Sequence, residues 1–286
     1  MTARHVVVVG GINADLKART TAPLVPGTSN PGTATLSPGW VGRNIAENLA
    51  RLCTPVSLVG VVGDDDLGRV VLAATREAGV DTAHVRTRRG PTGSYTALLD
   101  HRGELVAGIA DMGATDDLGP DDVPDLAGAA MLVLDGNLRP DTFARARERA
   151  REQGVPVVVD PVSVPKAARL AAELRDLRCL TPNRDELAAL GGVQTLLGRG
   201  VALVWERQGP DGSLLHTTAG VTTLAARLGE VVDVTGAGDA MLAAWCHAVL
   251  AGEGDAEAAA YAHEAAALTV ASPLTVRPDL REMLTR

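Results

Sequence analysis

Residues 56–79 read "VSLVGVVGDDDLGRVVLAATREAG", and this stretch decides the class of fold. Its first part, 56–63, is an apolar run of strand length, which is typical of a strand buried on both faces of a sheet. Its second part, 66–79, reads as a helix that ends at Gly79, because glycine often follows the last turn of a helix. A buried strand followed directly by a helix indicates an α/β protein.

The same alternation recurs along the 286 residues of the chain. Strands that alternate with helices predict a mostly parallel sheet covered on both faces, which is a three-layer, doubly wound α/β fold. The other strand candidates are 5–11, 129–136, 155–161 and 201–206, and the other helix candidates are 42–53, 139–154 and 184–192.

Two stretches break this alternation. Residues 16–38 are rich in Thr, Pro and Gly with half-polar alternation, and residues 93–110 read as a hairpin that turns at "HRG". We therefore expect a single domain over 1–286, with a small β-sheet built from segments at about 14–38 and 93–112. Two uses of this sheet stay open, namely a lid over a site and an edge or dimer surface.

Composition narrows the class of partner. The net charge of −8 argues against nucleic acid, because binding to a phosphate backbone requires a basic surface. There is no run of eighteen uninterrupted apolar residues, so no membrane span is expected, and the first residues do not resemble a signal peptide. We expect a cytoplasmic protein whose scattered cysteines, Cys53, Cys179 and Cys246, are reduced and mostly buried.

The motif "TGAGD" at 235–239 directly precedes an Ala-rich helical stretch. A helix N-terminus carries unpaired N–H groups and a partial positive charge, and glycine lets a ligand approach the backbone closely. The motif therefore predicts an anion-binding site. Asp239 is either a helix cap or the base of a kinase. No GxxxxGK[ST] motif occurs, so the chain is not a P-loop protein. "VGGINAD" lacks the third glycine of a dinucleotide-binding fingerprint, which disfavours a dehydrogenase.

Three motifs together resemble the signatures of the ribokinase-like (PfkB) carbohydrate and nucleoside kinases. They are "PGWVGRNIAENLARL" (38–52), "TPNRDE" (181–186) and "DVTGAGDAM" (233–241), and their order and spacing fit that family over essentially the whole chain. The resemblance implies a ribokinase-like fold and an ATP-dependent phosphotransferase. Within the family, the 93–112 hairpin and "DPVS" (160–163) resemble the members that phosphorylate pseudouridine, which implies transfer of the γ-phosphate of ATP to its 5′-hydroxyl.

The same resemblance implies roles for individual residues. Asp239 is expected to be the base, and Gly236, Ala237 and Gly238 are expected to form the anion hole. The acceptor side is expected to include Asp15, Asn13, Gly39, Trp40, Asn44, Tyr95 and Met112. The cofactor side is expected to include Asn183 and Glu186, acting through Mg²⁺ and its waters, Gly209, Gly212 and Thr235 beside the nucleotide phosphates, and Asp233 at a monovalent cation such as K⁺.

Structural alternatives remain for most of these residues. Asn183 and Glu186 also spell a capping box, which is compatible with the functional role. The remaining alternatives are turn residues for Asn13 and Asp15, a helix residue bonded to its own backbone for Asn44, loop orientation for Asp233, and hairpin packing for Tyr95 and Met112. Arg43 and Lys166 are expected to be surface charges.

Trp40 is a departure from the family pattern, which usually has two adjacent glycines where this chain has Gly39 and Trp40. A tryptophan brings a large side chain and disfavours positive φ. Three outcomes stay open: the ring points away and packs under the lid, leaving the pocket intact; it lines the pocket and stacks on a base; or it fills the sugar site and abolishes or redirects activity.

Other functions remain possible on these grounds. One is a kinase of the same fold that acts on another nucleoside or on a sugar such as ribose or fructose, and a more remote one is a non-catalytic ligand-binding protein. The expected partners are a small nucleoside and ATP, with no nucleic acid or membrane, and a homodimer formed through the lid.

Overall fold

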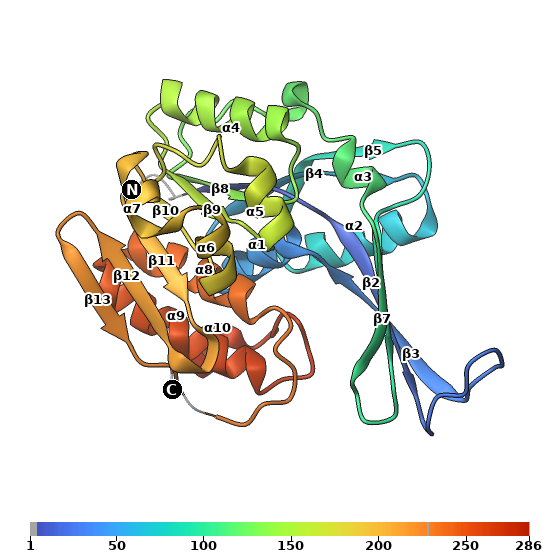
Figure 1. The fold of residues 1–286 in the computed structure, drawn as a ribbon. Coiled ribbons are helices and arrows are strands. Elements are labelled where there is room, and N and C mark those ends of the chain that lie inside the picture. Colours follow the sequence, from blue (N-terminus) through green and yellow to red (C-terminus); the bar gives the residue numbers. More distant parts are fainter. Residues whose placement is uncertain (1–4, 228, 286) are drawn as a thin grey trace.

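The structure, a computed structural model, describes residues 5–227 and 229–285, and in these it contains two β-sheets (Figure 1). The strands of the larger sheet are β1 (Val6–Val9), β4 (Val56–Gly63), β5 (Asp81–Arg88), β8 (Met131–Asp135), β9 (Val157–Asp160), β10 (Cys179–Leu180), β11 (Val204–Arg207), β12 (Ser213–Thr217) and β13 (Gly220–Leu224). They are ordered β13-β12-β11-β10-β9-β8-β1-β4-β5.

The strands from β5 to β11 run parallel to their neighbours, whereas β12 and β13 add an antiparallel hairpin at one edge. The strand order has a switch point at β1, because β4 and β5 lie on one side of it and β8 to β13 lie on the other. The predicted doubly wound, mostly parallel α/β fold is therefore confirmed.

Helices cover both faces of this sheet. Along β1, Val6 and Val8 point into one apolar core and Val7 and Val9 into the other, which explains the unbroken apolar run in the sequence. The first core is covered by α1 (Val41–Arg51), α2 (Asp66–Glu77), α8 (Ala237–Ala251), α9 (Asp255–Val270) and α10 (Leu280–Leu284). The second is covered by α4 (Pro140–Glu152), α5 (Val164–Leu170), α6 (Arg184–Ala189) and α7 (Gly192–Gly198).

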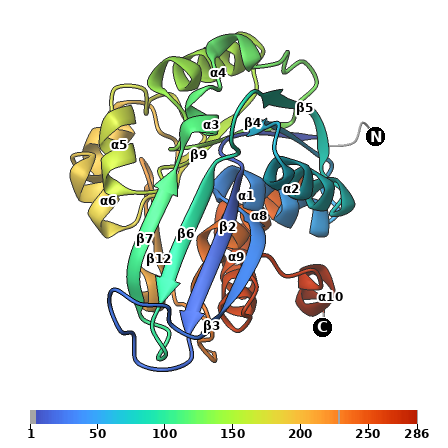
Figure 2. The ribbon, with the colours of Figure 1, turned by 90° about the vertical axis from the view of Figure 1, so that its right-hand side faces the viewer.

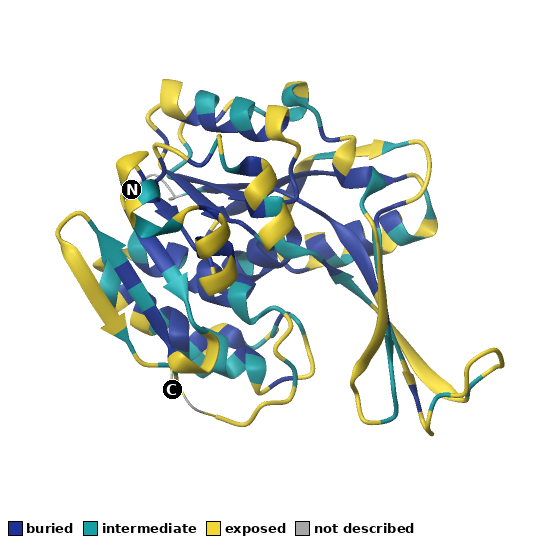
Figure 3. Cartoon of the chain, in the orientation of Figure 1, coloured by how far each residue is buried: buried dark blue, intermediate teal, exposed yellow. Residues whose placement is uncertain are grey.

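The smaller sheet stands away from this body (Figures 1 and 2). It contains β2 (Asn13–Thr20), β3 (Gly32–Gly39), β6 (Ser94–Leu99) and β7 (Leu105–Asp111), in the order β3-β2-β6-β7. Its hairpins come from the two stretches that broke the strand–helix alternation, and β2 pairs in parallel with β6. Figure 3 shows β7 exposed over its whole length.

Several short elements complete the chain. They are α3 (Gly113–Asp116) after β7 and the single 3₁₀ turns η1 (Pro120–Asp122) and η2 (Gly209–Asp211). No helix in 5–227 or 229–285 has the length and apolar character required to cross a bilayer. Cys179 and Cys246 are buried and Cys53 is exposed, and all three thiols are free.

Candidate active site

The first turn of α8 has the backbone that the glycine motif predicts. Gly236 is the N-cap of the helix and has a φ of 81°, and a Cβ there would collide with the carbonyl oxygen of Thr275. The amide of Ala237 donates to the Val234 carbonyl at 3.3 Å. Within the described residues, the amides of Gly238 and Asp239 have no acceptor, so they are the donors that remain for an anion.

Asp239 lies in this first turn and is 8% exposed. Its Oδ2 accepts a hydrogen bond from Asn44 Nδ2 at 2.9 Å, which links α8 to α1. Burial, followed by the negative charge of Asp160, raises the pKa of Asp239 from 3.8 to about 8. The carboxyl group is therefore tuned toward the range in which a general base works at neutral pH.

Three charged residues at the carboxyl ends of strands of the large sheet were not predicted from the sequence. Asp135 ends β8, Asp160 ends β9 and Arg207 ends β11. Asp135 is fully buried and its Oδ2 accepts from the amides of Gly11 and Gly42, at 2.9 and 2.8 Å. It thereby fixes the start of α1 against the end of β1. The signal available in the sequence was an acidic residue directly after an apolar strand.

The predicted acceptor residues gather where the small sheet meets the body. Asn13 and Asp15 are buried on β2, and Cβ atoms on Gly93 and Gly39 would collide with Asn13 Oδ1 and Asp15 Oδ2, respectively. Both Oδ1 atoms are buried without a hydrogen-bond partner in the described part of the chain. Asn13 Nδ2 lies 3.8 Å from Met112 Sδ. Burial raises the pKa of Asp15 to about 6. Two unpaired buried acceptors favour a ligand with hydroxyl donors over simple turn residues.

Trp40 packs beneath the small sheet, and its ring does not point away from the acceptor residues. It has a φ of 85°, and its ring lies against Gly11, with its centroid 6.3 Å from that of Tyr95. Lys166 Nζ lies 4.9 Å from the ring centroid and donates to Asn137 Oδ1. The indole Nε1 is buried and has no partner among residues 5–227 and 229–285. A bulky residue with positive φ and an unpaired donor indicates a functional constraint.

The expected surface position of two basic residues is wrong. Arg43 is 3% exposed and forms an ion pair with Glu47, because its long side chain runs inward beneath the small sheet to the Pro38 carbonyl. Lys166 is half-buried over Trp40, and burial lowers its pKa. The positions of Arg43 and Lys166 in the sequence gave no indication of these contacts.

A cavity of about 660 Å³ opens on the other side of the α8 N-terminus. It is lined by Asn183, Glu186, Gly209, Gly212 and Gly238, among others. Asn183 and Glu186 form the predicted capping box, with reciprocal bonds of 2.9 Å. Glu186 is 1% exposed and burial raises its pKa. The volume is sufficient for a nucleotide.

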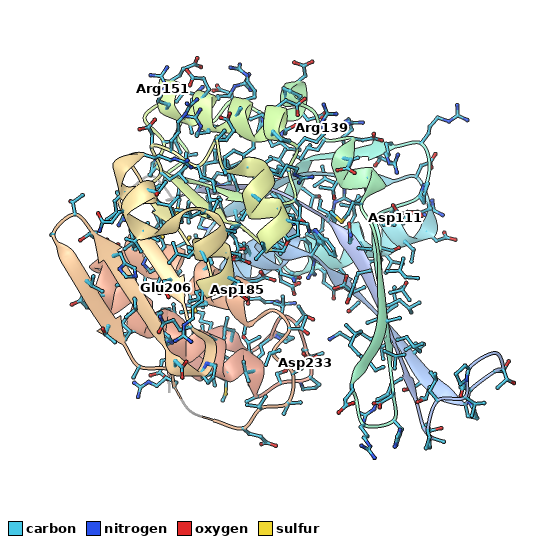
Figure 4. All side chains as sticks on the ribbon, viewed as in Figure 1. Asp111, Arg139, Arg151, Asp185, Glu206 and Asp233 are labelled. Carbon is cyan, nitrogen blue, oxygen red and sulfur yellow. The ribbon has the colours of Figure 1, made fainter. Side chains whose placement is uncertain are left out.

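Asp233 lies on the loop that leads into α8, on the side of the small sheet (Figure 4). Its Oδ2 accepts from Lys17 Nζ of β2 at 2.7 Å, and its Oδ1 accepts from the amide of Thr235 at 2.8 Å. The carboxylate thus pairs with an ammonium group of the small sheet and also orients the loop. The role of Asp233 at a monovalent cation stays a prediction.

The structure therefore brings the predicted residues together in two groups on either side of the α8 N-terminus. The first group borders the small sheet and contains Asn13, Asp15, Gly39, Trp40, Tyr95 and Met112, joined to Asp239 through Asn44. The second borders the cavity and contains Asn183, Glu186, Gly209 and Gly212. A transferring group held by the α8 amides would lie between them.

Comparison with known proteins identifies the family of the chain. Residues 3–282 match the family described as pfkB family carbohydrate kinase. The chain is 32% identical over 294 residues to the pseudouridine kinase of Escherichia coli strain K12, a match that covers 96% of this chain and 93% of that protein. The solved carbohydrate kinase from Agrobacterium tumefaciens has a TM-score of 0.88 at 32% identity, covering 99% of this chain and 96% of that chain. Arabidopsis thaliana ribokinase complexed with ribose and ATP has a TM-score of 0.87 at 26% identity and covers both chains fully, at 100% each.

Proposed function

The chain belongs to the pfkB family of carbohydrate kinases and is a phosphotransferase with an alcohol acceptor, and on that premise we propose that it uses ATP to phosphorylate the 5′-hydroxyl of pseudouridine. The observation that carries the proposal is the position of Asp239. Its carboxyl group lies beside the unpaired amides of the α8 N-terminus and is joined by Asn44 to the acceptor side.

In this mechanism the chain mainly positions and neutralises the reacting groups. The amides of Gly238 and Asp239 stabilise the transferring phosphoryl group, as donors fixed before the reaction begins. Asp239 accepts the proton of the attacking hydroxyl late in the transfer. Asn13 and Asp15 accept hydrogen bonds from the hydroxyls of the ribose through their unpaired Oδ1 atoms.

ATP would occupy the cavity beyond α8, whose lining includes Gly209 and Gly212, and Thr235 would lie near its phosphates. Asn183 and Glu186 fit a Mg²⁺ ion held mainly through water and phosphate oxygens, since their capping box leaves one Glu186 oxygen outside its two bonds. Bound there, the ion would neutralise charge on the phosphates. Asp233 would serve a K⁺ site only after its bond to Lys17 opens.

The proposal of pseudouridine as acceptor is supported by the similarity to the Escherichia coli enzyme and by Trp40 and Tyr95, which offer aromatic surface for a base. Ribose is the second candidate, because the Arabidopsis structure with ribose and ATP shares the whole fold at 26% identity.

A coupled assay of ADP release with pseudouridine, uridine, cytidine, adenosine and ribose tests the acceptor. We expect the highest kcat/KM with pseudouridine. A higher value with ribose would assign the chain to sugar phosphorylation, and turnover with none would leave ligand binding as its function.

We further propose that the small sheet is the lid of this site, which excludes water when closed, and that it pairs with a second copy. Exposed apolar residues on β7, namely Leu105, Val106 and Ile109, support the homodimer. The cytoplasm stays the predicted location.

A further inference from the structure

Arg207 places a cation at the N-terminus of α8, where no motif in the sequence indicates one. The residue ends β11, and a Cβ built on Gly238 would lie 2.7 Å from its Nη1. The side chain is 18% exposed and lines the 660 Å³ cavity. Its guanidinium group therefore lies against the first turn of α8, next to the two unpaired amides.

Carboxylates hold this guanidinium in place. Nη1 donates to Asp160 Oδ2 at 2.9 Å, and Nη2 lies 4.0 Å from Glu186 Oε2. Burial opposes the charge of Arg207, but Asp160, Glu186 and then Asp239 outweigh it and raise its pKa above the usual value. A guanidinium group has five N–H donors. In the described part of the chain only the bond to Asp160 uses one of them, so several remain for a ligand.

We propose that Arg207 is a catalytic residue that donates hydrogen bonds to the γ-phosphate during transfer, an inference that rests on the proposed kinase function. The positive end of α8 and the guanidinium group face the same point, and only an anion satisfies both. As the bond between the γ-phosphorus and the ADP oxygen breaks, ADP keeps the electron pair and the acceptor oxygen bonds to phosphorus. The acceptor proton passes to Asp239, while Arg207 neutralises the equatorial oxygens.

A positioning role is the competing explanation. Arg207 could act only by balancing the charge of Asp160 and thereby keeping the pKa of Asp239 from rising further. Loss of the cation would then shift the pH dependence of kcat without lowering its plateau at high pH. A residue that contacts the phosphoryl group would lower the plateau itself, by on the order of 10²–10³, which is below the full effect of an arginine finger because the helix amides remain.

The kinetic test compares Arg207→Gln, Arg207→Lys and the double variant Arg207→Gln/Asp160→Asn from pH 6 to 10. We expect both glutamine variants to lose about 100-fold or more of the plateau kcat, and the lysine variant to lose about tenfold. The control is Arg178→Gln, which removes an arginine paired with Asp255 at the opposite end of the adjacent strand β10 and should retain the wild-type rate. Recovery of the double variant to within about threefold of wild type would overturn the proposal.

A binding test separates this proposal from the proposed function. Isothermal titration calorimetry with MgCl₂ and either ADP or the non-hydrolysable analogue AMP-PNP measures the contact to the γ-phosphate without any acceptor. We expect Arg207→Gln to weaken AMP-PNP binding by about tenfold and to change ADP binding by less than about threefold. This result would hold even if no nucleoside were phosphorylated. An equal loss of affinity for the two nucleotides would exclude a contact between Arg207 and the γ-phosphate. Thermal melts of each variant confirm that it is folded.

Discussion

The pH dependence of the kinase reaction should follow the ionisation of Asp239. Burial and the charge of Asp160 raise the pKa of this residue to about 8, and a base acts only when it is deprotonated. With that pKa, about one molecule in eleven is ionised at pH 7 and about ten in eleven at pH 9. We therefore expect kcat/KM to rise about tenfold between pH 7 and pH 9, with a midpoint near 8.

The assay is coupled ADP release with pseudouridine at low concentrations of both substrates, because kcat/KM reports groups of the free enzyme. Asp239→Asn should lower kcat by on the order of 10²–10⁴ and remove the dependence on pH. Asp160→Asn should move the midpoint below 8, since it removes a negative charge and frees Arg207 to face Asp239. The variants share one buffer series with the wild type, which controls for effects on the coupling enzymes.

A wild-type kcat/KM that is constant from pH 6 to 9 would refute this reasoning. So would an Asp239→Asn variant whose rate stays within about threefold of wild type, because the amide cannot accept the proton. A midpoint that does not move in Asp160→Asn would show that burial alone sets the pKa of Asp239.

The remaining predictions concern stability and the acceptor pocket. Replacing Trp40 by glycine should raise KM for the nucleoside by about tenfold or more, in line with the loss of about 1–3 kcal/mol of stacking, and leave KM for ATP nearly unchanged; equal changes would exclude a role in the acceptor pocket. Gly236→Ala forces a side chain into the space of the Thr275 carbonyl at a φ of 81°, so it should cost roughly 1–3 kcal/mol and lower Tm by several degrees. Because the pKa of Asp239 is raised in the folded state, its neutral form contributes stability that is complete below about pH 4 and lost as the pH rises through about 8. Asp239→Asn should thus gain more urea resistance relative to wild type at pH 9 than at pH 5, and an equal difference at both values would contradict the raised pKa.

The sequence predicted the inner strands better than the edge strands for a physical reason. β4 was predicted with its observed bounds, because burial on both faces requires an unbroken apolar run. The edge strand β5 and the hairpin of β12 and β13 were not predicted, since half-exposed strands mix polar and apolar residues. The helix from 42 to 53 was shorter than expected and ends as α1 at Arg51.

The residues of the candidate site also fall into a group that the sequence predicted and a group that it did not. The residues of "TGAGD" were predictable because a local motif builds the helix N-terminus. Asp135, Asp160 and Arg207 were not, because each is a single residue whose role arises only when the order of the sheet brings strand ends together. The rule that ligands bind at the carboxyl ends of parallel strands would have selected the two acids from "VLDG" and "VVDP". It would not have shown that Arg207 turns toward α8.

Strain at two loops supports a site that is organised before any ligand arrives. Trp40 and Val162 both have positive φ, 85° and 70°, although neither is glycine. Such backbone costs on the order of 1–3 kcal/mol per residue and persists only where surrounding contacts fix it. Trp40 is the N-cap of α1, which carries Asn44, and Val162 lies two residues after Asp160, which holds Arg207. Trp40 and Val162 therefore each adjoin an element that orients a group at Asp239, where precise positioning of the base and the cation matters most, whereas Cys53 and Asp176 have positive φ away from this site.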